Sequence, residues 1–350
     1  ISTNPTFLSY WLAPVLAAFG ASEIVMHLAM LPFLILLSLS VAALSRRFAQ
    51  GSIWPVLFVM FSPAVVVSPN IMRDVPAAAL VTAGIAMFVG GTDKDRWSHA
   101  VCGALLAGLA TTTKYSTLIL IPVMALYPIF MRKPRFLIAL LVSLVPPGLW
   151  FFQNYLVHGK IHFLTMKSAE KANISLANMA LAALVITGAS FFLVPAFLIR
   201  HLIHFWRCAQ ALAAALIVAL LLPSWVHKVN PAQQAFQYYL WATLGGVVFF
   251  WLLTGWSGRT SRNEALDTVF LLLWLIGPCV CSILFVEFPA VRHILPAAAP
   301  IALLAVRYTL EPHAAANRWV RGAIGAALGV GLAIQAVVGF WVAAGDYQYA

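Results

Sequence analysis

Three charged residues at the edges of apolar stretches, Asp74, Lys114 and Arg292, are the first candidates for chemistry in this sequence. A carboxylate can accept a proton from an attacking hydroxyl, whereas lysine and arginine side chains bind phosphate groups. Asp74 precedes Val75-Pro76, which is also an ordinary way to begin a helix, so capping and functional roles carry equal weight. An interfacial arginine such as Arg292 often only anchors a helix end. The three residues predict a site for a phosphate-bearing ligand if the fold brings them together.

Other polar residues between the apolar stretches are secondary candidates. The two histidines beside Gly159, His158 and His162, have no convincing third metal ligand, so a surface role is favoured over a metal site. Glu287 and Asp346 are further carboxylates that suit a base or a metal ligand, and their spacing does not choose between these roles. Two further side chains that suit phosphate contacts are Arg73 and His293. Lys160 and Lys228 are possible phosphate contacts from the loops.

The elements that must position these residues are membrane helices. The chain has 350 residues, of which 63% are hydrophobic and 9% charged, and its mean hydropathy is +0.93, so a bilayer must be its solvent. The net charge of +11 falls between hydrophobic segments, which excludes nucleic acid as the explanation. The four cysteines show neither disulfide nor metal-ligand spacing and are interpreted as packing residues.

The apolar runs predict an all-α polytopic membrane protein with about twelve transmembrane helices. No internal repeat or soluble domain is evident. The domain organisation expected is an extracytoplasmic loop or interfacial helix over 1–22, with a helix from Ser9 to Phe19 ending at Gly20, a transmembrane domain over 23–344 and an extracytoplasmic tail over 345–350. The predicted spans are 24–44, 53–68, 75–90, 100–113, 116–130, 136–152, 176–199, 209–223, 238–253, 268–285, 294–306 and 320–344.

The distribution of lysine and arginine predicts the orientation of these spans. One alternate set of connections holds fourteen of these residues and the other holds seven, so the first set is expected to be cytoplasmic and both chain ends extracytoplasmic. The acids of the first set, including Asp93, Asp95 and Asp267, are expected to be solvated loop charges. The apolar stretch Ala100–Phe130 must then cross twice and turn near Thr111–Tyr115. This hairpin puts Lys114 on the predicted outer side, facing a protein or water-filled cavity.

Several motifs, in this order along the chain, resemble the GT-C glycosyltransferases of the protein O-mannosyltransferase and aminoarabinose-transferase type. The resemblance covers most of the chain, and its motifs are moderately specific. It rests on Asn4-Pro5-Thr6-Phe7-Leu8 with Phe19-Gly20-Ala21-Ser22-Glu23, on Ser68-Pro69-Asn70-Ile71-Met72-Arg73-Asp74-Val75-Pro76 with Gly108-Leu109-Ala110-Thr111-Thr112-Thr113-Lys114-Tyr115, and on Arg292-His293-Ile294-Leu295-Pro296 with Pro300.

The resemblance implies a transferase that moves a sugar from a polyprenyl-phosphate donor to a protein, lipid or glycan acceptor. It implies inversion at the anomeric carbon, an extracytoplasmic active face, a bacterial inner membrane and, in some members, a divalent cation such as Mg²⁺ or Mn²⁺. On these motifs Asp74 matches the acid of the family's second outer loop. Lys114 matches the lysine after its Gly-Leu-Ala run, and Arg292 matches the arginine before its Leu-Pro pair, while His293 stands where tyrosine is frequent.

One departure from the family's pattern lies at the start of the chain. The family's principal acid belongs to the first outer loop, but residues 1–22 contain neither Asp nor Glu. We therefore expect a first span and this acid upstream of Ile1, and the alternative is a catalytically inactive relative. Two further hypotheses from the residues alone stay open: a multi-span transporter or lipid flippase, and a structural membrane scaffold. Paired inverted halves, usual in transporters, are not found in the sequence.

Overall fold

The fold was analysed in a computed structural model that describes residues 7–66, 71–161, 176–195, 197, 233–255, 261–285, 291–310 and 318–348. All regular structure in these ranges is helical, which confirms the predicted fold class at that level. The chain divides into two compact units, described separately below. The first comprises Ile1–Leu44 and Ser68–Ala172, and the second comprises Ser45–Val67 and Asn173–Ala350.

The chain is a helical membrane protein by the length and apolar character of its helices. Within the described ranges six helical segments are long and apolar enough to span a bilayer, and five shorter apolar helices have 10 to 17 residues. The expected count of twelve is therefore not reached by length, and the expected span 209–223 lies outside the described residues. The six long segments are Glu23–Phe48, Asp74–Asp93, Pro134–His158, Arg262–Leu284, Arg292–Leu310 and Arg318–Trp341.

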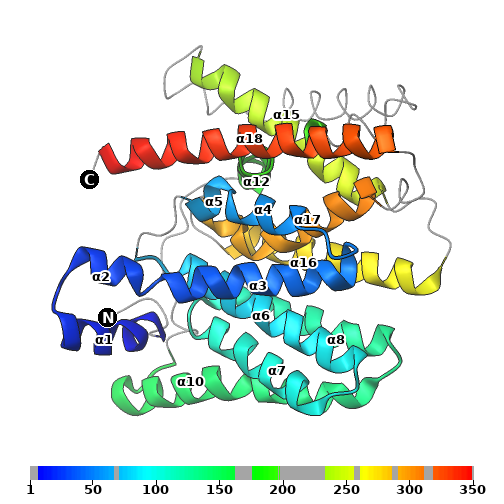
Figure 1. The fold of residues 1–350 in the computed structure, drawn as a ribbon. Helices are drawn as coiled ribbons and strands as arrows, with labels where there is room; N and C mark the ends of the chain where they lie inside the picture. The colour runs from blue at the N-terminus through cyan, green and yellow to red at the C-terminus, as the bar shows by residue number, and fades with distance from the viewer. Residues whose placement is uncertain are drawn as a thin grey trace. The chain divides into compact units, whose positions relative to one another are not determined.

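In the first unit the helices from α6 onward run alternately in opposite directions (Figure 1). The short helix predicted before the first span is present as α1, and Gly20 ends it at a φ of +69°, a conformation that favours glycine. The helices of this unit are α1 (Phe7–Phe19), α2 (Glu23–Leu28), α3 (Leu31–Phe48), which enters the second unit, α6 (Asp74–Asp93), α7 (Trp97–Thr111), η1 (Tyr115–Ile119), α8 (Leu120–Phe130), η2 (Pro134–Phe136), α9 (Leu137–Leu140), η3 (Leu141–Leu144) and α10 (Val145–His158).

Small residues let α6 and α7 pack with their backbones in close contact. A Cβ atom on Gly84 would lie 2.8 Å from the carbonyl oxygen of Gly103, and one on Gly103 would lie 2.5 Å from the backbone nitrogen of Phe88. A Cβ atom on Gly91 would likewise lie 2.5 Å from the backbone nitrogen of Ala100. In a bilayer, where apolar side chains gain little by leaving lipid, such close approach is a main source of helix association. The pair α6–α7 is thereby fixed as the frame of the first unit.

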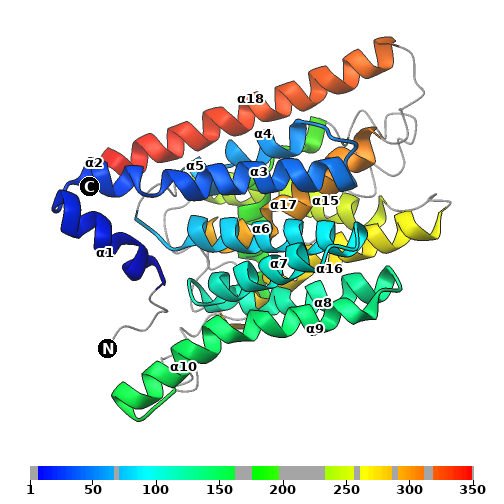
Figure 2. The same cartoon turned by 60° about the horizontal axis from the view of Figure 1, so that its bottom comes forward.

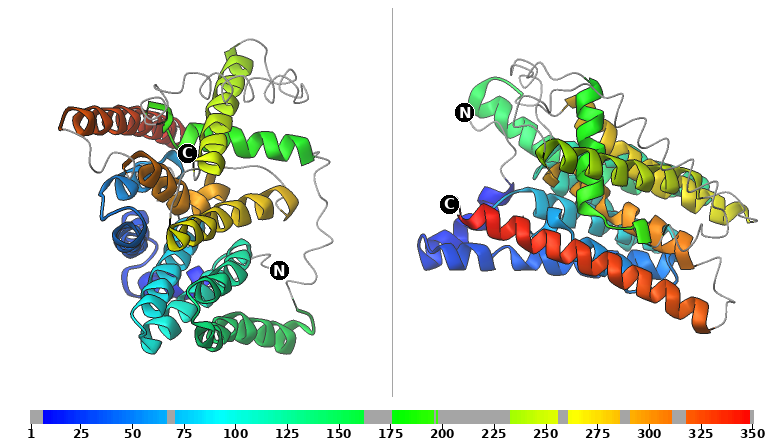
Figure 3. Two further views of the ribbon diagram at one scale, coloured as in Figure 1. Left: turned by 90° about the vertical axis from the view of Figure 1, so that its right-hand side faces the viewer. Right: turned by 90° about the horizontal axis from the view of Figure 1, so that it is seen from above.

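The second unit contains one long helix, α18, and several shorter ones (Figure 3). Figure 3 also shows α12 and α15 crossing, where Gly188 and Gly245 leave no room for a Cβ atom against the opposite backbone. Trp274 of α16 donates a hydrogen bond to the Pro296 carbonyl of α17 over 2.9 Å. The helices of this unit are α4 (Trp54–Met60), α5 (Pro63–Val66), α12 (Leu176–Ser190), α15 (Gln233–Thr254), α16 (Arg262–Phe285), η7 (Val291–Ile294), α17 (Leu295–Leu310) and α18 (Arg318–Gln348).

Two spans expected in this unit are interrupted. The segment 53–68 forms α4 and α5, separated at Phe61-Ser62, because Pro63 has no N–H to continue the helix ladder. The helix predicted over 176–199 ends at Ser190. Both interruptions contact the fully buried Gln335 of α18, which donates to the Phe58 carbonyl over 2.6 Å and accepts from the Phe192 N–H over 3.2 Å. One amide side chain thus satisfies backbone groups at both helix breaks.

The expectation for Asp267 was wrong. It was predicted to be a solvated loop charge, but its side chain is only 7% exposed and pairs with both terminal nitrogens of Arg47, at 2.8 and 3.0 Å. Asp267 lies one and a half turns inside α16 and is buried there, and a buried carboxylate needs such a partner. Asp95 is exposed as expected.

Candidate functional site: an ion pair at the start of α6

The first unit brings together two of the three principal candidates. The Lys114 ammonium donates a hydrogen bond to Oδ1 of Asp74, with the nitrogen and oxygen 2.5 Å apart. The Asp74 side chain is 9% exposed and that of Lys114 is 22% exposed. The two residues are forty positions apart in sequence, so helix packing, and not local sequence, creates the pair.

Asp74 is held in place by the start of α6. It is the first residue of the helix, and Arg73 is the N-cap, whose side chain makes no capping hydrogen bond. Asp74 is thus inside the helix and not at the N-cap position, and its negative charge suits the positive end of the helix dipole. The carboxylate instead faces Lys114. Pro76 in the first turn needs no N–H partner, which favours a helix start here.

Lys114 is held by the turn that was predicted between α7 and α8. Helix α7 ends at Thr111, and three buried threonines then direct their hydroxyls back to its last carbonyls. Thr111 donates to Ala107 over 3.2 Å, and Thr112 and Thr113 both donate to Leu109, over 2.8 and 2.9 Å. Backbone and hydroxyl groups are thus satisfied without water, as an apolar environment requires.

Aromatic residues from α1 and α10 surround this turn. The Phe7 N–H donates to the Thr112 carbonyl over 3.3 Å, which fixes the start of α1 beside the turn. Trp150 of α10 donates to the Tyr115 hydroxyl over 2.8 Å. Gln153 of α10 in turn donates to the Tyr10 hydroxyl of α1 over 3.1 Å. These contacts place α1, the turn and α10 at one end of the first unit (Figure 2).

Arg73 supplies a second cation beside the pair. Its side chain is half-buried, and burial lowers the pKa of this guanidinium from its ordinary value, while the neighbouring Asp74 carboxylate acts in the opposite direction. An arginine held at this position adds a planar set of donors that suits phosphate oxygens. The chemistry available at this end of the first unit is therefore one carboxylate with two cations.

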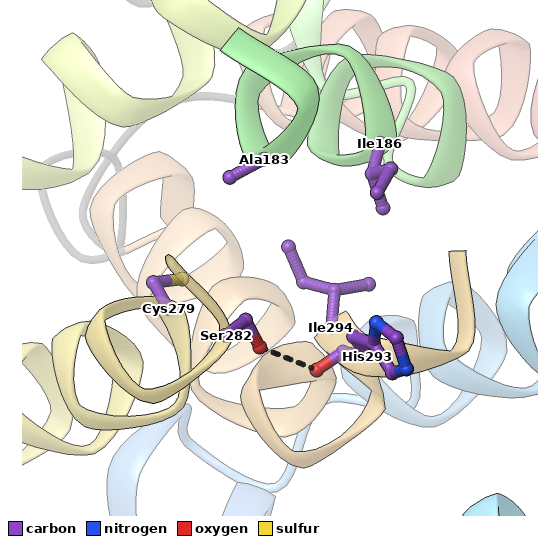
Figure 4. Close-up of a pocket in the computed structure, with 6 residues that line it drawn as sticks. All are labelled: Ala183, Ile186, Cys279, Ser282, His293 and Ile294. Carbon is purple, nitrogen blue, oxygen red and sulfur yellow. Dashed lines mark hydrogen bonds between the residues drawn. The ribbon is translucent and has the colours of Figure 1, made fainter. Parts of the chain in front are cut away.

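Arg292 and His293 lie in the second unit, in the short helix η7 before α17. Both are partly exposed, and Ser282 of α16 donates to the His293 carbonyl at 3.5 Å. Figure 4 shows a cavity that His293 helps to line, formed by residues of α12, α16 and η7. Its volume is about 20 Å³, which is room for a water molecule and not for a sugar. The lining residues are Ala183, Ile186, Cys279, Ser282, His293 and Ile294.

The remaining candidates are not brought to the ion pair by any contact of the described residues. Lys160 and His158 lie at the end of α10 and are exposed, and Gly159 ends that helix at a φ of +66°. Asp346 lies in α18, which continues to Gln348, past the end expected at 344. Candidates that lie outside the described residues are His162, Lys228 and Glu287.

A metal site was left open by the sequence. Across the described ranges no group of three or more His, Cys, Asp or Glu side chains stands close enough to hold a metal ion. Asp74 is the one acidic side chain of the candidate site within these ranges, and it forms an ion pair with the Lys114 ammonium. The donor set described here fits anion binding better than cation binding.

Sequence reasoning overlooked two polar features of the second unit, the Arg47–Asp267 pair and Gln335. Gln335 carries a signal that a sequence does show, because a lone amide in a long apolar helix needs a buried partner. Comparison with known proteins adds no further residue: no protein-family model, curated protein or solved structure matches this chain.

Proposed function

We propose that this protein is a membrane glycosyltransferase that transfers a sugar from a polyprenyl-phosphate donor to an acceptor hydroxyl at the extracytoplasmic face. The observation that carries the proposal is the Asp74–Lys114 pair, since it unites the acid of one motif with the lysine of another. The motif resemblance supplies the reaction class, and the asymmetry of charged loops supplies the face. A twelve-span GT-C-like topology in a bacterial inner membrane belongs to the same proposal.

The chemistry needs a base and a stabilised leaving group. Asp74 takes the proton from the acceptor hydroxyl, whose oxygen forms the new bond to the anomeric carbon from the face opposite the phosphate. The bond between that carbon and the phosphate oxygen breaks, and the electron pair leaves with the polyprenyl phosphate. Lys114 and Arg73 bind the phosphate, and Arg292 of the second unit is the further cation that the motifs assign to this role. Donor binding draws Lys114 toward phosphate and so releases the Asp74 carboxylate.

The test is sugar transfer by the full-length protein in proteoliposomes, with a panel of polyprenyl-phosphate sugars. Asp74→Asn keeps the shape of the side chain but removes the base, so we expect transfer to fall by about 10²-fold or more. Lys114→Arg should retain part of the activity, whereas Lys114→Met should not. Asp95→Asn is the matched control, because it removes an exposed carboxylate in the loop between α6 and α7. Normal transfer by both Asp74→Asn and Lys114→Met would exclude this site.

A second candidate function is a transporter or lipid flippase. One observation favours it: the second unit contains two interrupted helices, and at both breaks a backbone group bonds to the Gln335 side chain. Interrupted helices of this kind form substrate sites in many transporters. Movement of a lipid-linked sugar across the proteoliposome membrane without covalent transfer would support this function and contradict the transferase proposal.

A further inference from the structure

Two loops of the first unit carry a cluster of cations, at the end of α6 and the end of α8. These are the right-hand ends of the two helices in Figure 1. The first loop contains Lys94 and Arg96, and the second contains Arg132, Lys133 and Arg135. Lys133 joins them by donating to the carbonyls of Thr92 and Asp93, over 2.7 and 3.0 Å. The hydroxyl of Tyr127 also donates to Asp93 over 2.7 Å. The loops therefore form one fixed surface.

Only part of this positive charge is balanced by the protein. Asp95 pairs with Arg135 and lies 3.8 Å from the Lys133 ammonium. Lys94, Arg96 and Arg132 are exposed, and none of them forms an ion pair with any described residue. Lys94, Arg96 and Arg132 are therefore three cations without a counter-charge among the described residues, on the surface that the two loops form together.

The backbone conformation at Arg132 points to a role for its side chain beyond forming the loop. Arg132 has a φ of +57°, the left-handed conformation in which glycine is normally found after a helix. The turn is closed by the Lys133 N–H, which donates to the Pro128 carbonyl over 2.7 Å. A glycine would make this turn with less strain, so the arginine contributes something other than the fold of its loop.

The surface also has the aromatic residue expected at the boundary between lipid tails and water. Trp97, the first residue of α7, is 44% exposed and packs against Phe136, with the ring centroids 5.4 Å apart. Tryptophan gathers at this depth of a bilayer, and lysine and arginine near it attract anionic headgroups. The two loops adjoin the end of the span Asp74–Asp93 and the start of the span Pro134–His158, so they lie at headgroup level.

We propose that Lys94, Arg96 and Arg132 form a binding surface for anionic phospholipid headgroups, such as phosphatidylglycerol. The surface is independent of the proposed transferase reaction. It distinguishes anionic from zwitterionic lipid by charge, while the Lys133 and Asp95 contacts keep the two loops at a fixed spacing.

The test compares thermal unfolding of the full chain in nanodiscs of phosphatidylcholine alone and of phosphatidylcholine with phosphatidylglycerol. Phosphatidylglycerol should raise the unfolding midpoint by about 5 °C at low ionic strength, and salt should reduce the rise. Arg132→Gly should lose about a third of this rise, although it relieves backbone strain and so leaves the midpoint in phosphatidylcholine unchanged or higher. Arg132→Lys retains charge and should keep the rise, and Lys94→Gln/Arg96→Gln should lose most of the remainder.

Three results would overturn the proposal. The first is an equal midpoint for the wild type in both nanodiscs. The second is an undiminished rise in the variant that combines Arg132→Gly with Lys94→Gln and Arg96→Gln. The third concerns the source of the phosphate group. Inorganic phosphate added to phosphatidylcholine nanodiscs should give no rise, and a rise equal to that from phosphatidylglycerol would assign the surface to soluble anions.

Discussion

The Asp74 carboxylate and the Lys114 ammonium balance each other in a largely buried position. A pair of this kind contributes little net stability compared with an apolar pair, but loss of one partner leaves the other charge buried and uncompensated. For the proposed transferase this is useful, because an anionic donor competes for the lysine with the carboxylate that must act as base. In that proposal the lysine neutralises the carboxylate in the resting protein and moves to the donor phosphate when it binds.

A double-mutant cycle measures this interaction. Asp74→Ala alone should destabilise the protein by about 3 kcal/mol, because Lys114 keeps a charge without its partner. Lys114→Met in the same chain should recover most of that loss. The free energy of unfolding in detergent micelles is the measurement. Strictly additive losses in the double variant would show that the two side chains do not interact.

The pair Asp95–Arg135 predicts a pH dependence at the opposite end of the first unit. The hydrogen bond from Arg135 lowers the pKa of Asp95, and the charges of Arg135 and Lys133 act in the same direction. Since the folded-state pKa is depressed, the stabilisation is present above the ordinary value of about 3.9 and is lost as the pH falls through the lowered value. The difference in unfolding midpoint between the wild type and Asp95→Asn should therefore disappear in acid. A difference that persists in acid would contradict this origin.

Single residues were predictable where loop alternation constrained them. The turn that carries Lys114 was predicted from the charge of the flanking loops. The position of Asp74 at a helix start was predicted from the Val75-Pro76 that follows it. The pairing of Arg47 with Asp267 was not predictable, because 220 positions separate them and no local pattern selects one arginine among many. Their pairing depends on which helices pack together, and the sequence does not reveal that.

Among the helices, α6 and α7 depend on glycine for their close contact. Gly103→Ala places a Cβ atom 2.5 Å from the Phe88 backbone nitrogen, so α7 must move away from α6. We expect a loss of about 1–3 kcal/mol in the free energy of unfolding. Gly90→Ala is the control in α6, because open space surrounds that position and alanine favours helix. Equal effects of the two substitutions would show that the close contact does not hold the helices.

Gln335 connects the interrupted helices of the second unit. Gln335→Leu removes a donor to Phe58 and an acceptor for Phe192, and it leaves both backbone groups buried. The expected cost is about 2–4 kcal/mol in the free energy of unfolding. Val337→Ala on the exposed face of α18 is the control and should change stability little. If Gln335→Leu unfolds at the same midpoint as that control, the amide has no bridging role.

The positions of helices were easier to predict than their lengths. Each predicted span in the described residues contains helix, because apolar sequence without water leaves no other way to satisfy most of the backbone. The interruptions were not predicted. Pro63 gave a signal for the first of them. Near the second, Gly188 lies inside α12 and Pro195 lies five residues past Ser190, so neither marks the break, where Gln335 of α18 accepts from the Phe192 N–H.

For the whole molecule, the class of membrane protein was predictable from composition, but the number of spans was not. In the part of the chain that the structure describes, five apolar helical segments of 10 to 17 residues are shorter than a bilayer crossing, so hydropathy alone does not separate a short span from a helix buried in protein. The division into two units was also not predicted, since segments far apart in sequence contribute to each.

The topology itself is open to a direct test in the first unit. Three helical segments, α7, α8 and α10, separate Ser98 from Lys160, and both residues are exposed. In a chain without its native cysteines, Ser98→Cys and Lys160→Cys should therefore react with an impermeant thiol reagent from opposite sides of intact vesicles. The predicted orientation puts Lys160→Cys outside. Labelling of both from one side would contradict the hairpin.

The three threonine hydroxyls at the turn after α7 also bear on how the chain enters its membrane during synthesis. A turn whose polar groups are satisfied internally can pass into lipid together with its two helices, so α7 and α8 can insert as one hairpin. The remaining obstacle is the charge of Lys114. Its counter-ion is translated forty residues earlier, so a ribosome delivers the carboxylate before the cation that needs it.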